Sequence, residues 1–262
     1  MSRQGAHACE DKRQAALTLC GVHKTFYSES GEAVEALADL SLTVGDGDFV
    51  TLIGATGCGK STTLNLIAQL ETVTAGEVRL GGGLCAGKNI ACVFQHYTLF
   101  PWRNVLRNVT FGLQMRGVGR RERTARARVL LEQVGLSGFE NAYPHELSGG
   151  MRQRAAIAQA LAIEPRLLLM DEPFGALDDS TRKDLQQMLI ELWQINHITI
   201  LFVTHNIDEA IVMGDRVVVF SGRPGTVVRE FLVDLPRPRN RMTREFTEMF
   251  IAVRHSLATG LD

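Results

Sequence analysis

The sequence of 262 residues lacks any apolar run long enough to cross a bilayer. A spanning helix needs about 20 consecutive apolar residues. The longest apolar stretches here, at 167–170 and 198–203, have the length of buried strands. The first residues, MSRQGAHACEDKRQ, are polar and carry both charges, so they do not form the apolar region of a secretory signal. We therefore expect any membrane association to go through a partner protein.

The sequence also lacks an excess of one charge and a metal-binding cysteine pattern. The formal net charge is -1, which leaves no global basic surface for nucleic acid. No CxxC pair and no cysteine/histidine spacing typical of zinc is present, so we expect free thiols in a reducing compartment. The length suits one large domain or a domain with an inserted lobe. The cysteines are Cys9, Cys20, Cys58, Cys85 and Cys92.

Short apolar runs alternate with helical patterns over much of the chain. Phe49–Ile53 is a continuous apolar run, as expected for a parallel strand covered on both faces. The runs at 167–170 and 198–203 have the same character, and amphipathic patterns at 185–195 and 207–213 indicate helices between and after them. Strands separated by helices need crossover connections, so the pattern predicts a parallel sheet.

The flanking regions differ from this core. The run at 17–22 and the apolar alternation from 40 to 44 predict half-buried strands near the N-terminus. A helix is predicted over 122–134, and we interpret the arginines at 120–128 as a solvated helix face rather than a binding patch. We expect a flexible N-terminus over 1–16, one domain over 17–240 with a helical part over about 96–162, and a short helical tail over 241–262.

Residues 54–62 read GATGCGKST, which fits the phosphate-binding pattern G-x-x-x-x-G-K-[ST] between an apolar strand and a helix. The glycines let the backbone N–H groups point at an anion, and the helix N-terminus favours phosphate. Lys60 would bind the β and γ phosphates and Ser61 would bind Mg²⁺. A glycine-rich turn with a chance lysine is the weaker alternative because the flanking elements have the required order. The expected nucleotide-binding residues are Gly54, Ala55, Thr56, Gly57, Cys58, Gly59, Lys60, Ser61 and Thr62.

Acidic residues follow the apolar run at 167–170. Ligands gather at the carboxyl ends of parallel strands. Asp171 can therefore approach Mg²⁺, and Glu172 can orient or deprotonate a water at the γ-phosphate. The alternative is a polar helix start favoured by the helix dipole, and the phosphate-binding loop makes the functional interpretation the better one. His205 follows the next strand and can reach the γ-phosphate, but its position alone leaves a structural role equally open.

The stretch LSGGMRQR at 147–154 resembles the signature motif of ABC ATPases, and LLLMDEP follows it at the family's spacing. Gln95 in VFQ resembles the Q-loop glutamine, and Asp178 in GALD resembles the acidic residue of the D-loop. His205 in VTHNIDEA resembles the switch histidine, and Phe26 in VHKTF takes the place of the adenine-stacking aromatic. These motifs occur in the family's order over nearly the whole chain.

The resemblance implies an α/β P-loop NTPase (RecA-like) core with an N-terminal antiparallel β-subdomain and an inserted α-helical subdomain. It implies an ATPase with ATP and Mg²⁺ as cofactors. The implied catalytic residues are Glu172, His205, Gln95 and Asp178, and the implied metal ligands are Ser61, Gln95 and Asp171.

Ser148, Gly149 and Gly150 precede a helical pattern, and a serine with free N–H groups at a helix N-terminus can bind an anion. An ordinary helix cap is the alternative interpretation. The resemblance implies that these residues of one subunit cover the ATP held by the phosphate-binding loop of the other. It therefore implies a head-to-tail homodimer of nucleotide-binding subunits.

The segments at 100–113, 171–178 and 223–239 resemble the nitrate, sulfonate and taurine importer branch of the family. This implies uptake of a small anion through integral membrane permease subunits, with an extracytoplasmic substrate-binding protein acting indirectly. The chain would then lie at the cytoplasmic face of the bacterial cell inner membrane as a peripheral subunit. Tyr97, Phe100 and Trp102 would line a groove for a permease helix, or alternatively belong to the buried core.

Two other function classes fit less well. ABC ATPases that act on DNA or ribosomes need long coiled-coil insertions or a second cassette, and this chain has one copy of each motif and a net charge of -1. A nucleotide kinase or a regulatory binding module would not need the signature and the acidic pair together. We therefore expect no nucleic-acid partner, and the transported anion stays open among nitrate, taurine, an alkanesulfonate and bicarbonate.

Overall fold

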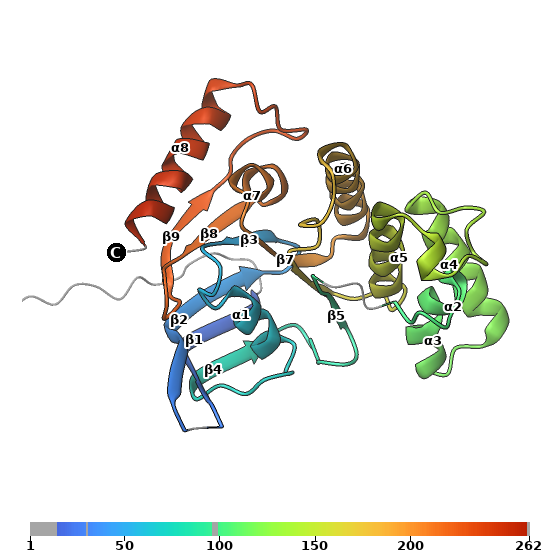
Figure 1. Cartoon of the computed structure of the whole chain (residues 1–262), viewed down its shortest axis with the longest axis horizontal. Helices are drawn as coiled ribbons and strands as arrows, with labels where there is room; N and C mark the ends of the chain where they lie inside the picture. The colour runs from blue at the N-terminus through green and yellow to red at the C-terminus, as the bar shows by residue number, and fades with distance from the viewer. Residues whose placement is uncertain (1–14, 30, 96–98, 261–262) are drawn as a thin grey trace, which may run out of the picture.

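The computed structural model describes residues 15–29, 31–95 and 99–260 (Figure 1). The strands are β1 (Ala15–Tyr27), β2 (Ala33–Gly45), β3 (Phe49–Ile53), β4 (Ala75–Leu80), β5 (Ile90–Val93), β6 (Leu167–Asp171), β7 (Thr199–Thr204), β8 (Arg216–Phe220) and β9 (Val227–Leu232). The helices are α1 (Lys60–Ile67), α2 (Val105–Val109), α3 (Phe111–Met115), α4 (Arg120–Gln133), α5 (Gly149–Leu161), α6 (Asp179–Asn196), α7 (Ile207–Met213) and α8 (Arg244–Thr259), with a 3-10 turn at Pro144–Glu146.

A six-stranded sheet in the order β5-β6-β7-β3-β8-β9 forms the centre of the molecule. Its strands run parallel except β9, which pairs antiparallel with β8. Every residue of β3 is buried, which confirms the prediction of a strand covered on both faces. Helix α1 lies on the opposite side of the sheet from α6 and α7 (Figure 1).

The central strands supply two hydrophobic cores because successive side chains point to opposite faces. Val50 and Leu52 pack with α1 and with the small N-terminal sheet. Phe49 and Ile53 pack on the other face, in the core that α5, α6, α7 and α8 share. Phe49, Thr51 and Ile53 therefore face the side of the sheet that α7 covers, and Val50 and Leu52 face the other side. A hydrophobic core therefore packs on each face of the sheet and fixes the position of the carboxyl ends of its strands.

A separate antiparallel sheet has the order β2-β1-β4. We expected residues 1–16 to be flexible, but strand β1 already begins at Ala15. The reason is that the Ala16 side chain is buried in the core beneath this sheet. Residues 1–14 lie outside the described part of the chain. Strands β4 and β5 were not predicted from the sequence.

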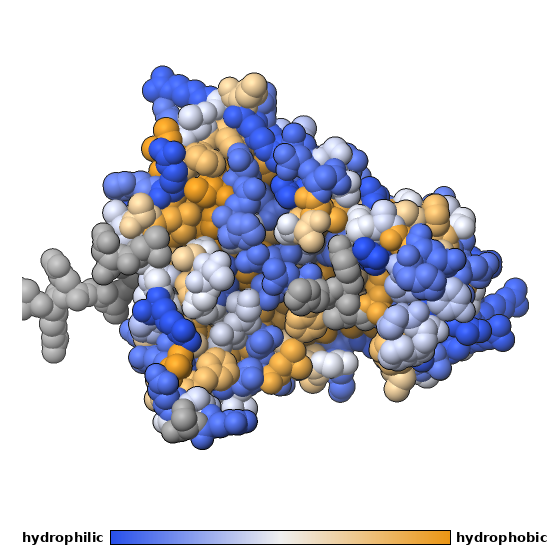
Figure 2. Space-filling view, in the orientation of Figure 1, coloured by the Kyte–Doolittle hydropathy of each residue, from blue (hydrophilic) through white to orange (hydrophobic). Residues whose placement is uncertain are grey.

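The helical part, α2 to α5, forms a lobe beside the β5 edge of the large sheet (Figure 1). Hydrophilic side chains cover most of its outer end, around α3 and α4 (Figure 2). Helix α8 lies where we expected the helical tail, and it packs against α7 and β8. Among the described residues, no helix is both long enough and apolar enough to span a bilayer.

Candidate functional site

The phosphate-binding loop connects β3 to α1, as the motif predicted. Gly59 ends the loop with a φ of 93°, in the left-handed region. A Cβ at this position would lie 2.5 Å from Leu37 Cδ2 and 2.8 Å from the Ala36 carbonyl oxygen. Only glycine therefore allows the loop to pack this closely against β2 while α1 begins at Lys60.

The ammonium group of Lys60 is buried at the inner side of this loop. It donates hydrogen bonds to the carbonyl oxygens of Gly54 at 2.8 Å and Ala55 at 2.9 Å. Its further contact is Cys58 Sγ at 3.5 Å, and a thiol is a weak acceptor. Because a buried ammonium is stable only when its donors are satisfied, a phosphate oxygen would be a stronger partner for the third donor. This arrangement fits the predicted role of Lys60 in phosphate binding.

Asp171 and Ser61 form a second part of the site. Asp171 ends β6, and burial raises the pKa of its carboxyl group, while a hydrogen bond from Ser61 lowers it. The charges of Glu172 and Lys60 act on this pKa in opposite directions. A hydroxyl and a carboxylate are the hard oxygen ligands that Mg²⁺ prefers. Gln95 leaves β5, which pairs with β6, at the same edge of the sheet, and its side chain is exposed.

The described residues contain no group of three or more histidine, cysteine, aspartate or glutamate side chains that could hold a metal alone. A magnesium ion at Ser61 and Asp171 would take its remaining ligands from phosphate oxygens and water, which is how Mg²⁺ usually binds beside nucleotides. The donor set therefore fits a magnesium ion that arrives with a nucleoside triphosphate.

Glu172 and His205 are in direct contact. Glu172 Oε2 lies 2.8 Å from His205 Nδ1, and both side chains line a cavity of about 130 Å³. The backbone of Glu172 has a φ of 42°, a left-handed conformation that costs a non-glycine residue about 1–3 kcal/mol. Its N–H donates to the Val203 carbonyl oxygen at 3.0 Å, which holds this conformation. Pairing through Nδ1 leaves the other ring nitrogen of His205 for a different partner.

Phe26 lies near the end of β1 with an exposed ring. The Lys24 ammonium lies 4.7 Å from the ring centroid and 2.9 Å from Glu71 Oε2, so one side of the ring faces a fixed cation. Phe26 is paired with Val34 of β2, the strand that the phosphate-binding loop contacts at Leu37. The position is compatible with stacking of a purine base.

The signature residues lie at the start of α5. Ser148 caps this helix by accepting a hydrogen bond from the Met151 N–H at 3.3 Å, as the ordinary-cap interpretation predicted. A Cβ on Gly150 would lie 2.4 Å from Thr181 Cγ2, so α5 packs tightly on the start of α6. Asp178 caps α6 through the Thr181 N–H at 3.0 Å, and this hydrogen bond lowers the pKa of its carboxyl group.

The predicted site residues therefore form two groups. Lys60, Ser61, Asp171, Glu172 and His205 lie at the carboxyl edge of the large sheet, whereas Ser148 lies in the helical lobe. Helix α1, which the phosphate-binding loop precedes, and α5, which Ser148 caps, are well separated in Figure 1.

Sequence reasoning missed residues that line the cavity around Glu172 and His205. The polar ones are Arg182 on α6, Thr204 at the end of β7, Asn206 before α7 and Glu209 on α7. A signal for Glu209 was present, because it lies in the VTHNIDEA segment, but we selected only His205 from that motif.

The aromatic residues at the start of the helical part differ in burial. Trp102 is 71% exposed and lines a groove of about 710 Å³, so the buried-core alternative is wrong for this residue. Phe100 is half-buried and packs on Phe111 with ring centroids 4.7 Å apart. Tyr97 lies outside the described residues. The arginines that line the groove are Arg103, Arg107, Arg120, Arg123 and Arg128.

Comparison with known proteins settles the family. The family model described as ABC transporter matches residues 37–175. The chain belongs to the ABC transporter family. This ABC protein is 45% identical over 231 residues to a nitrate import ATP-binding protein of Synechocystis sp., covering 86% of each chain. It is 47% identical over 214 residues to a taurine import ATP-binding protein of Rhizobium johnstonii, covering 81% of this chain and 82% of that protein.

A solved structure agrees with this assignment. A dimeric ATP-binding cassette in a post-hydrolysis state, bound to ADP and Pi, superposes with a TM-score of 0.72 at 35% identity. The match covers 83% of this chain and 98% of that one. The predicted P-loop NTPase fold with its antiparallel β-subdomain and helical insertion is therefore confirmed, and the chain is an ABC-type ATPase.

Proposed function

We propose that this ABC protein is the ATP-hydrolysing subunit of an importer that energises uptake of a small anion, such as nitrate, taurine or an alkanesulfonate, through a membrane permease. The observation that carries the ATPase part is the contact between Glu172 and His205 beside Lys60 and Asp171. The importer part is supported by the similarity to ATP-binding proteins named for nitrate and taurine import.

Each residue of the site has a defined task in this proposal. Lys60 binds the β and γ phosphates of ATP, and Ser61 and Asp171 hold Mg²⁺, which neutralises phosphate charge when bound. Glu172 accepts a proton from the attacking water or orients it, and His205 is held by Glu172 so that its second ring nitrogen faces the γ-phosphate. In this proposal Gln95 and Asp178 act at the edges of the ATP site, and Phe26 stacks on the adenine.

The separation of the two groups of residues supports a dimer. Within one chain, Ser148 and the glycines after it lie at the start of α5, away from the loop that holds Lys60. A head-to-tail homodimer brings the α5 N-terminus of one subunit to the ATP of the other. The helix dipole and the free N–H groups then stabilise the phosphate charge.

The groove beside Trp102 supports contact with a permease. An exposed tryptophan and a set of arginines suit a protein interface, where these residue types are enriched. Three of these arginines belong to the stretch 120–128, which we interpreted from the sequence as a solvated helix face, and here we propose instead that they favour an acidic segment of the permease as occupant. The chain would then lie at the cytoplasmic face of the inner membrane, and an extracytoplasmic substrate-binding protein would select the anion.

Copurification tests the importer part. The tagged chain is expressed in the organism that it comes from, and its complexes are extracted from the membrane fraction in mild detergent. We expect permease subunits to copurify and to raise ATP hydrolysis when reconstituted with the substrate-binding protein and its anion. Recovery with ribosomes or DNA, and not with a permease, would contradict the proposal. The variant Lys60→Ala is the control, and it should keep the permease but lose ATP binding.

A further inference from the structure

A buried carboxylate on α7 lies behind the catalytic pair. Glu209 is 5% exposed and accepts a hydrogen bond from Gln186 Nε2 at 3.0 Å. Its other carboxylate oxygen accepts a hydrogen bond from Thr204 Oγ1. Gln186, on α6, is itself 4% exposed. The carboxylate is thus fixed by two elements that are far apart in the sequence.

These contacts fix both neighbours of His205. Thr204 Oγ1, which donates to Glu209, also accepts a hydrogen bond from the Asn206 N–H at 3.0 Å. The Asn206 side chain in turn accepts a hydrogen bond from the Glu209 N–H at 3.2 Å. The residues before and after His205 are therefore both tied to Glu209, while the imidazole contacts Glu172. All of them line the same cavity.

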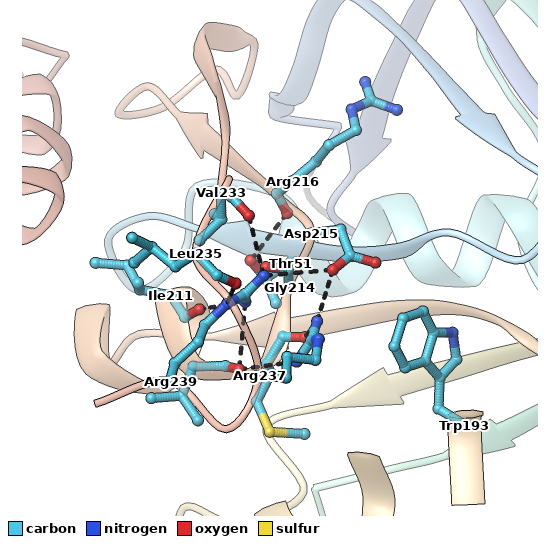
Figure 3. Close-up of polar contacts among 12 residues, drawn as sticks. Thr51, Trp193, Ile211, Gly214, Asp215, Arg216, Val233, Leu235, Arg237 and Arg239 are labelled. Atoms are coloured by element: carbon cyan, nitrogen blue, oxygen red, sulfur yellow. Dashed lines mark hydrogen bonds and ion pairs between the residues drawn. The ribbon is translucent and has the colours of Figure 1, made fainter. Parts of the chain in front are cut away.

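The same hydrogen-bond network extends from Gln186 to the segment before α8, which comprises residues 233–243. Arg241 Nη2 donates to Gln186 Oε1 at 3.2 Å. In the same segment, Arg237 and Arg239 donate to the last carbonyl oxygens of α7 and to Asp215 (Figure 3). Helix α7 is therefore held at its first turn through Glu209 and at its last turn by these arginines.

A role in packing alone does not explain a carboxylate at position 209. Ala210, Ile211 and Met213 of the same helix are buried and anchor it with apolar side chains. Burying a carboxylate is costly unless its hydrogen bonds are made, and an apolar side chain of similar size commonly stabilises such a site as well or better. The carboxylate differs from an apolar side chain in that its hydrogen bonds fix the orientation of the Thr204 hydroxyl and of the backbone on both sides of His205.

We propose that Glu209 is a positioning residue for ATP hydrolysis, which acts through Thr204 and Asn206 to keep His205 on Glu172. Gln186 and Arg241 extend this hold to the segment before α8, so that segment is coupled to the switch histidine. The inference rests on the proposed role of His205.

A double-mutant cycle tests this inference. Glu209→Leu removes both acceptors at similar volume, and a small misplacement of a catalytic group costs about 10- to 100-fold in rate. We expect kcat to fall by that factor and the KM for ATP to change by less than about 3-fold. Glu209→Gln should keep at least about a third of wild-type kcat, because the amide oxygen can accept from Gln186 while the amide N–H donates to the Thr204 hydroxyl. In a His205→Ala background, Glu209→Leu should change kcat by less than about 2-fold.

Equal effects of Glu209→Leu on kcat in the two backgrounds would overturn the inference and leave the role of His205 intact. A His205→Ala variant with wild-type kcat would instead show that the proposed role of His205 is wrong, and the inference would fail with it. Where Glu209→Leu does not fold, Thr204→Val, which keeps the side-chain shape and removes the hydroxyl, is run through the same cycle with the same expectations.

A substitution at Arg241 tests whether the segment before α8 is coupled to His205. Arg241→Ala removes one hydrogen bond to Gln186, and we expect kcat to fall by about 2- to 10-fold, the usual effect of one such bond. Arg244→Ala is the matched control, because this exposed arginine pairs only with Glu248 among the described residues. Equal kcat values for the two variants would overturn the coupling of this segment to His205.

Discussion

We expect the substitution Glu172→Gln to separate ATP binding from ATP hydrolysis in this protein. Glu172 Oε2 lies 2.8 Å from His205 Nδ1. A glutamine has the same length and keeps an oxygen that can accept this hydrogen bond. The substitution therefore preserves the geometry of the pair and removes the negative charge and the ability to take a proton from water.

The expected magnitude follows from that difference. A positioned general base contributes about 10²- to 10⁴-fold to a rate, so kcat should fall by this factor. Lys60 and Asp171 are unchanged, so the Kd for Mg-ATP should stay within about 3-fold of the wild-type value. A change of this size is smaller than the loss of one strong hydrogen bond would cause. The left-handed backbone at 172 suits glutamine as well as glutamate, so Tm should shift by less than about 4 °C, the equivalent of roughly 1 kcal/mol.

The assay combines phosphate release under saturating Mg-ATP with ATP binding by titration calorimetry and mass measurement by size-exclusion chromatography. The variant should bind ATP, hydrolyse it slowly and elute as a dimer in the presence of Mg-ATP. His205→Ala is the companion variant, and it should also lower kcat without abolishing ATP binding. Hydrolysis by Glu172→Gln at the wild-type rate would refute the role of Glu172.

Further outcomes concern stability, thiol reactivity and the permease. Arg239→Met removes a buried guanidinium and leaves the carbonyl oxygens of Ile211 and Val233 without the hydrogen bonds that it donates, so the free energy of unfolding should fall by about 3 kcal/mol. This lowers Tm in calorimetry, and an unchanged Tm would contradict the account of Figure 3. Burial raises the pKa of the Cys92 thiol to about 11. At pH 8 Cys92 should therefore stay protonated and react with iodoacetamide far more slowly than exposed Cys85, and the difference should shrink as the pH approaches 11. Trp102→Ala should leave the ATPase activity of the isolated chain unchanged and weaken permease binding by about 30-fold or more, the usual effect of truncating an interface hot spot. If the Trp102→Ala variant binds the permease with unaltered affinity, a surface other than the groove beside Trp102 binds the permease.

The sequence predicted those parts of the fold that depend on local patterns. The boundaries of β3 and α7 were predicted as the structure has them, because each is a short apolar or amphipathic pattern between clear turn or polar signals. Strand β4, with the sequence AGEVRL and a largely exposed surface, shows no such run, and pairing with the distant β1 is what makes it a strand. Strand β5 has four residues, too few for a periodic pattern.

The same division applies to the site. Lys60, Glu172 and His205 follow strands within recognisable motifs, so the ends of the parallel strands predicted their common edge. Glu209 and Gln186 were missed because their importance depends on the packing of α6 against α7, which lie 23 positions apart at this contact. A buried glutamine in an amphipathic helix carries no local signal of its partner.

The sandwiched ATP is the central claim, and a structure of the Glu172→Gln variant crystallised with Mg-ATP tests it most directly. The account predicts a dimer in which Ser148 Oγ of one subunit lies within about 2.5–3.5 Å of a γ-phosphate oxygen of the ATP bound by Lys60 of the other. An ATP-bound dimer in which both copies of Ser148 lie far beyond hydrogen-bonding distance of every phosphate would contradict the claim.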